Sequence, residues 1–230
     1  YTNAALKLVA GDVNRARDPR RENRMMELAA KAASVREGSR DFAEEGFFEY
    51  HLYTLDGRTT LKNQQTKQLA LLSGSDVPVV KHLMYYGAQD YYRNSYGMPI
   101  SNQKVAVLLE IKNSAENRLG MPLPKGKVRV YKADASGSQQ FIGEDWIEHT
   151  PKDERVKIKL GDAFDVVGER TQKDWRKLGS GLWEVEWEIS LRNHKKQDQI
   201  VTVIEPVPGD WQVLHSTHTY EKPEAHTLKF

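Results

Sequence analysis

The sequence predicts an all-β protein, mostly antiparallel, in which an immunoglobulin-like β-sandwich follows a β-rich N-terminal region. Apolar and polar residues alternate in many short segments, Gly, Pro and Asp separate these segments, and no βαβ pattern is present. The clearest alternation runs from 183 to 191. We expect Trp183, Val185, Trp187 and Ile189 to be buried there, and the intervening Glu184, Glu186 and Glu188 to be exposed.

Composition sets the limits on function. The chain has 230 residues, of which 39% are apolar, so it can form a hydrophobic core. Its net charge is +2, so no nucleic-acid partner is expected. Cysteine is absent, which excludes disulfides, thiolate metal sites and a cysteine nucleophile. No apolar run is long enough for a transmembrane segment.

The N-terminal part is expected to contain one helical insertion near 19–37. Asp18 and Pro19 form a favourable helix start, apolar residues then recur every three or four positions, and Gly38 is a suitable stop. The arginine cluster of this part lacks interleaved aromatic residues, so we do not expect it to bind nucleic acid; its members are Arg15, Arg17, Arg20, Arg21 and Arg24.

The rest of the chain is divided into predicted strands. An aromatic strand at 47–53 precedes Asp56-Gly57, a hairpin-turn signal, and a returning strand at 59–63. We place the boundary near residue 102, which gives a β-rich region at 1–102 and an immunoglobulin-like sandwich at 103–230. The other expected strands are 4–9, 68–72, 79–86, 105–111, 127–131, 156–160, 183–191, 200–204, 211–219 and 226–230.

Several blocks of the sequence resemble a bacterial family of unknown function, domain of unknown function 4139, some members of which are described as mucoidy inhibitors. The blocks keep the family's order over most of 47–206. They are Phe47-Phe48-Glu49-Tyr50-His51-Leu52-Tyr53, Asn63-Gln64-Gln65-Thr66-Lys67-Gln68, Pro124-Lys125-Gly126-Lys127-Val128-Arg129-Val130-Tyr131, Ile142-Gly143-Glu144-Asp145, His149-Thr150-Pro151 and Leu160-Gly161-Asp162-Ala163-Phe164-Asp165-Val166.

The resemblance implies a bacterial cell envelope and a periplasmic or otherwise extracytoplasmic location. It brings no catalytic residues and no cofactor. The chain begins at Tyr1 and ends inside a predicted strand, so we expect a piece of a longer protein whose N-terminal partner domain is missing.

Sequence motifs for catalysis are absent: the chain has no nucleophile elbow, no HExxH pair and no phosphate-binding glycine loop. The strongest acidic cluster is Glu144, Asp145, Glu148 and His149 around Trp146. It suggests an alternative function, a hydrolase of envelope carbohydrate or peptide, but a solvated strand face is the favoured explanation of the cluster.

Metal sites are not expected. His215 and His218 are three residues apart, which on a strand places them on opposite faces, and His226 is distant in sequence. We interpret these histidines as surface residues. Asp162 and Asp165 flank Ala163-Phe164, where a turn is favoured over a calcium site because too few oxygen ligands are adjacent.

Two polar or aromatic segments remain as binding candidates. The amide-rich block 63–68 could hydrogen-bond a ligand, although a role in satisfying backbone groups is favoured. The 85–96 segment is the preferred binding surface, because loops carry function and tyrosine offers amphipathic contact area; the alternative is a tyrosine-capped core. Its predicted binding residues are Tyr85, Tyr86, Tyr91, Tyr92, Arg93 and Tyr96.

The sequence thus favours a non-enzymatic envelope module that binds a protein chain or a cell-surface polymer. An enzyme would show a concave pocket with convergent, pKa-perturbed carboxylates, whereas a binding module would show an exposed aromatic patch.

Overall fold

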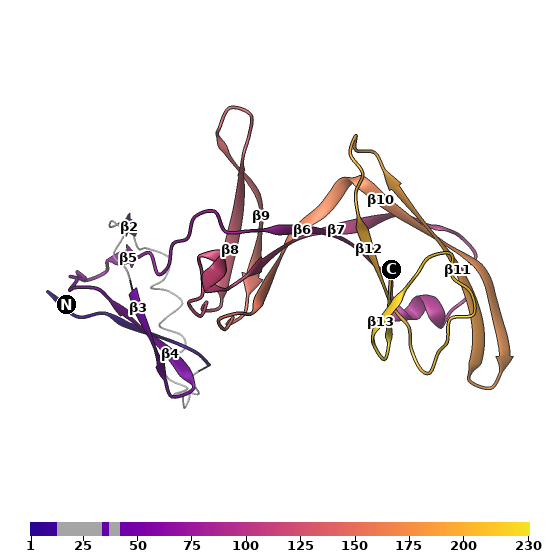
Figure 1. Cartoon of the computed structure of the whole chain (residues 1–230), viewed down its shortest axis with the longest axis horizontal. Coiled ribbons are helices and arrows are strands. Elements are labelled where there is room, and N and C mark those ends of the chain that lie inside the picture. The colour runs from indigo at the N-terminus through magenta and orange to yellow at the C-terminus, as the bar shows by residue number, and fades with distance from the viewer. Residues whose placement is uncertain (13–33, 37–41) are drawn as a thin grey trace. The chain divides into compact units, whose positions relative to one another are not determined.

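The computed structural model describes residues 1–12, 34–36 and 42–230 (Figure 1). Within them the protein is all-β, which confirms the predicted class; the helices there are two short 3₁₀ helices, η2 (Gln89–Tyr92) and η3 (Ala115–Asn117). Most of the predicted helix at 19–37 lies outside the described residues, as does the arginine cluster. The described part of that range, Ser34–Arg36, is strand β2, so no helical insertion is seen there.

The chain forms two compact units, each built from separate stretches of sequence. The first comprises Tyr1–Pro78, Lys112–Gly126 and Ile147–Val156, and the second comprises Val79–Ile111, Lys127–Trp146 and Lys157–Phe230. The predicted boundary near residue 102 lies inside strand β7 (Ile100–Lys112), because this strand belongs to the central part of a sheet.

The first unit contains a three-stranded antiparallel sheet in the order β1 (Lys7–Ala10), β4 (Tyr50–Leu55), β3 (Phe42–Phe47). Strand β2 pairs in parallel with β5 (Thr66–Gln68). The small core consists of buried Phe42, Tyr53 and Leu55, and partly buried residues packed against them include Leu6, Leu69 and Met121.

The predicted hairpin after the aromatic strand is wrong. Strand β4 pairs with β3 on one edge and with β1 on the other, so no edge is left for residues 59–63. The tight turn lies upstream, at Phe48 and Glu49, and of the predicted returning strand only Thr59 makes a bridge, to Ala4. A turn signal such as Asp56-Gly57 therefore marked the end of a strand without specifying its partner.

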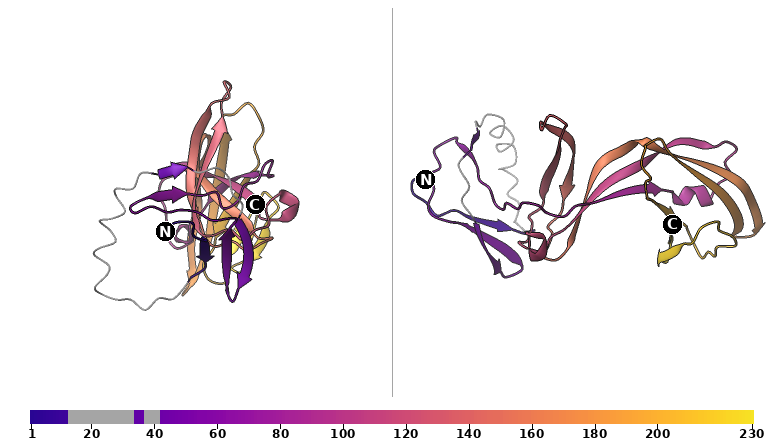
Figure 2. Two further views of the ribbon diagram at one scale, coloured as in Figure 1. Left: turned by 90° about the vertical axis from the view of Figure 1, so that its left-hand side faces the viewer. Right: turned by 45° about the horizontal axis from the view of Figure 1, so that its top comes forward.

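The second unit is built on a curled, mixed sheet of seven strands (Figure 2). The order is β11 (Leu182–Asn193), β10 (Arg155–Gly179), β7, β6 (Val80–Tyr86), β12 (Val201–Pro206), β14 (Thr227–Lys229) and β13 (Glu221–Glu224). Strands β12 and β6 pair in parallel, whereas the pairs β10–β11, β6–β7, β12–β14 and β13–β14 are antiparallel. A separate two-stranded hairpin consists of β8 (Gly126–Ala133) and β9 (Gln139–Ile147).

The core of the second unit lies between β6, β7, β10 and β12. Its buried residues are Leu83, Tyr85, Val105, Ala163, Val166 and Val203. The immunoglobulin-like sandwich is not confirmed, because the described strands form one curled sheet and a hairpin. Residues 211–219 were predicted as a strand and form no regular strand, while Gly161-Asp162, predicted as a turn, lies inside β10.

The strand predicted from the alternation at 183–191 is present as β11, but its burial is only partly as expected. Glu186 and Glu188 are exposed, and Val185, Trp187 and Ile189 are half-buried. Trp183, predicted to be buried, is 43% exposed, and Glu184 is half-buried. The reason is position: β11 is an edge strand, and other residues pack against its middle, at Trp187 and Ile189.

Candidate binding surface

The most unusual chemistry of the second unit is a buried ion pair between β10 and β12, two strands that β7 and β6 separate in the sheet order. Arg170 on β10 is 0% exposed and Glu205 on β12 is 1% exposed. The guanidinium donates from Nη1 to Oε2 at 2.9 Å and from Nη2 to Oε1, so the contact is bidentate. An unpaired charge at this depth would be strongly destabilising, so each residue requires the other.

Aromatic rings surround this pair. The Arg170 guanidinium lies 4.8 Å from the ring centroid of Tyr91 and 5.5 Å from those of Tyr85 and Trp187. Tyr92 donates a 2.8 Å hydrogen bond from its hydroxyl to Glu205. Cation–π attraction adds to the charge pairing where water is excluded. The guanidinium is therefore enclosed by the protein's own rings and carboxylate.

The pKa shifts reflect this burial. Burial raises the pKa of the Tyr92 and Tyr85 hydroxyls, and the nearby negative charge of Glu205 acts in the same direction on both. Burial lowers the pKa of Arg170, but the hydrogen bonds and charge of Glu205 outweigh it and leave the pKa above its usual value. Both tyrosines stay neutral and Arg170 stays charged near neutral pH.

Two glycines make the enclosure possible. A Cβ atom at Gly87 would lie 2.3 Å from Oε2 of Glu205, and one at Gly168 would lie 2.2 Å from the Tyr85 ring. These distances are far below van der Waals contact, so any side chain would displace the carboxylate or the ring. The sequence around both positions is thus dictated by a contact with a residue distant in the chain.

The 85–96 segment covers the inner side of the curled sheet, where η2 lies in Figures 1 and 2. Trp187 contacts Tyr91 and Tyr96, each with ring centroids 5.6 Å apart, and its Nε1 donates to the Tyr91 carbonyl at 3.2 Å. Gln103 donates to the Tyr91 hydroxyl at 2.9 Å and accepts from the Tyr85 hydroxyl. The segment is held to the sheet by side chains throughout.

The six predicted binding residues therefore divide into two groups. Tyr85 is 0% exposed, which contradicts its role as a surface contact, and Tyr91, Tyr92 and Tyr96 are half-buried against the Arg170–Glu205 pair or Trp187. The tyrosine-capped core is the better description of these four. Tyr86 and Arg93 are exposed, but they belong to a segment whose other tyrosines are packed.

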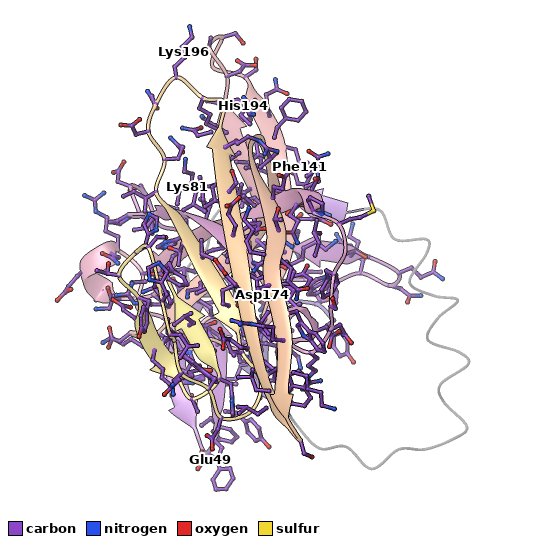
Figure 3. All side chains as sticks on the ribbon, turned by 90° about the vertical axis from the view of Figure 1, so that its right-hand side faces the viewer. Glu49, Lys81, Phe141, Asp174, His194 and Lys196 are labelled. Carbon is purple, nitrogen blue, oxygen red and sulfur yellow. The ribbon has the colours of Figure 1, made fainter. Side chains whose placement is uncertain are left out.

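An exposed aromatic surface is found instead on the β8–β9 hairpin. Trp146 is 69% exposed, and Tyr131 and Phe141 are about half exposed with ring centroids 5.6 Å apart. Figure 3 labels Phe141. Lys127 Nζ lies 5.6 Å from the Trp146 ring centroid. We define the hairpin patch as Tyr131, Phe141, Ile142 and Trp146 with Lys127, Arg129 and Glu144.

Glu144 is fixed by the cations of the hairpin patch. Its carboxylate accepts from Lys127 Nζ at 2.6 Å and from Arg129 Nε at 3.0 Å, and these hydrogen bonds lower its pKa. A general acid for hydrolysis needs a raised pKa. Asp145 accepts from the backbone N–H of Lys159 at 2.7 Å, so it too has a structural partner.

The remaining candidates show local roles. His215, His218 and His226 are exposed, and no cluster of potential metal-binding side chains occurs in the described part of the chain. In the 63–68 block, Gln65 accepts from the Lys62 backbone and Lys67 donates to Thr59, which fits the structural interpretation. Asp165 uses its backbone carbonyl to accept from His194.

Sequence reasoning missed the hairpin patch, although a signal was present. Alternating positions are occupied by Lys127, Arg129 and Tyr131 in one strand and by Ile142, Glu144 and Trp146 in the next. The side chain of Asp134 accepts hydrogen bonds that hold the turn between the two strands. Hydrogen bonds from Ser136 and Gln140, chiefly the Ser136 hydroxyl, lower the pKa of Asp134 to about 2. Joining the two strands through the Asp134 turn would have paired Tyr131 with Phe141, whereas the proximity of Trp146 to Lys127 does not follow from simple alternation.

No protein-family model, curated protein or solved structure matches this chain. The resemblance to the family of unknown function therefore stays an expectation from sequence. None of the helices in the described ranges is long and apolar enough to cross a membrane.

Proposed function

We propose that this chain is a non-enzymatic module of the bacterial cell envelope that recognises a protein chain or a surface polymer through the hairpin patch. The observation that carries the proposal is the exposed aromatic surface around Trp146. Aromatic side chains left in water with charged neighbours are typical of recognition surfaces. The envelope setting rests on the sequence resemblance.

The competing proposal, a hydrolase using the Glu144–His149 cluster, has less support. Glu144 is held ionised by two cations, and Glu148 and His149 belong to a different compact unit from Glu144. The His149 Nδ1 accepts from the Lys125 backbone at 3.2 Å, so that nitrogen already has a donor. These contacts favour a structural role for Glu144 and His149.

Binding to fractionated envelope tests the proposal. Purified chain is incubated with washed peptidoglycan, extracted surface polysaccharide and solubilised envelope protein from the source organism, and the bound fraction is measured. Trp146→Ala should weaken binding to one fraction by about tenfold, as loss of a central aromatic contact does. Its stability should stay within about 0.5 kcal/mol of the wild type.

Phe164→Ala is the matched control, because Phe164 is a highly exposed aromatic residue of the same unit but lies on β10. This variant should bind like the wild type. Equal binding by the wild type and Trp146→Ala in every fraction would reject the hairpin patch as the recognition surface. Release of soluble fragments by the wild type and not by Glu144→Gln would favour the hydrolase.

A further inference from the structure

The β3–β4 hairpin of the first unit ends in an exposed aromatic tip. Phe47 pairs with Tyr50, so the loop between the strands consists of Phe48 and Glu49 alone. Phe48 is 90% exposed and Phe47 is more than half exposed. Figure 3 labels Glu49 at this tip. We call Phe47, Phe48, Glu45 and Glu49 the Phe48 tip.

The backbone of Phe48 is in a conformation that other residue types adopt more readily than phenylalanine does. Its φ is 58°, in the left-handed region, and two-residue hairpin loops prefer Gly, Asn or Asp at such positions. A bulky residue in this region is strained. Packing offers little compensation, because Phe48 is 90% exposed and meets the Tyr50 ring only in a tilted contact with centroids 6.5 Å apart. The fold thus holds an aromatic ring in water at a strained position.

The charges beside the two exposed aromatic surfaces are complementary. Glu45 and Glu49 are exposed beside Phe48, whereas Glu44 is paired with His51 at 2.8 Å. The hairpin patch carries the two cations Lys127 and Arg129 against the single carboxylate Glu144. With a net charge of +2, whole-molecule repulsion between two copies is weak.

We infer that the Phe48 tip of one copy binds the hairpin patch of a second copy. This contact rests on the proposed function, in which the hairpin patch is a recognition surface, and it names the partner as the chain itself. Phe48 would lie against Trp146 and Tyr131, with Glu45 and Glu49 near Lys127 and Arg129. Because the two surfaces differ, the contact is heterologous and generates rings or open chains of molecules.

Sedimentation velocity of the 230-residue chain tests this inference. Between about 5 and about 200 µM the wild type should shift to larger species, and added salt should weaken the shift. Phe48→Gly removes the ring and places the preferred residue in the turn, so association should be lost while stability is unchanged or higher. Trp146→Ala should also abolish association, and Phe164→Ala should not.

Mixing the two defective variants gives the sharpest result. Phe48→Gly retains an intact hairpin patch and Trp146→Ala retains an intact Phe48 tip, so an equimolar mixture should form one-to-one dimers and nothing larger. A wild type that stays monomeric at all concentrations would overturn the inference. So would association that survives Phe48→Gly, or a mixture that stays monomeric.

The sedimentation experiment and the envelope-binding experiment test different claims, and their outcomes can be told apart. A monomeric wild type whose envelope binding still depends on Trp146 would remove self-association and leave the proposed function intact. Association that depends on both Phe48 and Trp146, without any envelope binding, would support self-association alone.

Discussion

Two regions of the second unit combine a carboxylate, a cation and aromatic rings, and they differ in exposure to water. Around Arg170 and Glu205 the rings of Tyr85, Tyr91 and Trp187 exclude solvent. On the hairpin patch the Glu144 carboxylate and its cations remain accessible. The difference teaches that residue types alone do not separate a buried core from an exposed surface.

The ion pairs of the two regions should also differ in how much they contribute to stability. A buried pair is sensitive to loss of one partner, whereas an exposed pair contributes little because water and salt screen it. The aromatic rings also differ, since those of the 85–96 segment are held by hydrogen bonds and ring contacts, while Trp146 is 69% exposed.

The largest effect is expected for Arg170→Ala, which leaves Glu205 buried without a counter-charge. The free energy of unfolding should fall by about 3–5 kcal/mol in urea denaturation. Combining Arg170→Met with Glu205→Leu should recover much of this loss, because no charge is then buried. Glu144→Gln is the exposed comparison and should leave the denaturation midpoint unchanged. A similar loss of stability in Arg170→Ala and Glu144→Gln would remove the distinction between the buried and the exposed ion pair.

Tyr91→Ala combined with Tyr92→Ala should reduce the free energy of unfolding by about 2–4 kcal/mol, as truncation of packed aromatic residues does. Tyr92 loses its hydrogen bond to Glu205, and Tyr91 loses its contacts with Arg170 and Trp187. Thermal or chemical denaturation measures the loss. A change below about 0.5 kcal/mol would restore the 85–96 segment as an open surface.

Gly87→Ala should destabilise the protein by about 1–3 kcal/mol, because the new methyl group overlaps the Glu205 carboxylate. Gly97 provides a control in the same segment, since no atom lies within 4 Å of a Cβ placed there. The denaturation midpoints of Gly87→Ala and Gly97→Ala should therefore differ clearly. Equal midpoints would mean that the carboxylate does not sit against Gly87.

A smaller effect is expected from Tyr53, the buried tyrosine of the first unit. Burial raises its pKa from 10.0 to about 12, and the charge of Glu44 adds to the shift. Because the unfolded chain ionises first, the stabilisation is complete below pH 10 and is lost as the pH rises toward 12. Stability measured across this window should fall in the wild type and fall less in Tyr53→Phe.

At neutral pH, Tyr53→Phe should cost only about 1 kcal/mol, because one hydrogen bond is lost. That bond runs from the hydroxyl to the Pro122 carbonyl at 2.6 Å. Identical alkaline profiles for the two proteins would show that Tyr53 does not titrate with the predicted shift.

The sequence by itself determined the class and several strands. Alternation at 183–191 defined β11, and the apolar runs at 79–86 and 200–204 correspond to β6 and β12, because side chains on a strand alternate between faces whatever the strand pairs with. The sequence also allowed a second interpretation of the 85–96 segment, in which its tyrosines cap a core.

Only the tertiary structure decided which strand pairs with which and which aromatic residues stay in water. Trp183 and Trp187 lie on one strand with the same parity, yet only Trp187 meets Tyr91 and Tyr96. Tyr92 and Glu205 are 113 residues apart and meet only because β12 lies beside β6. Burial depends on these long-range pairings, and local periodicity carries no information about them.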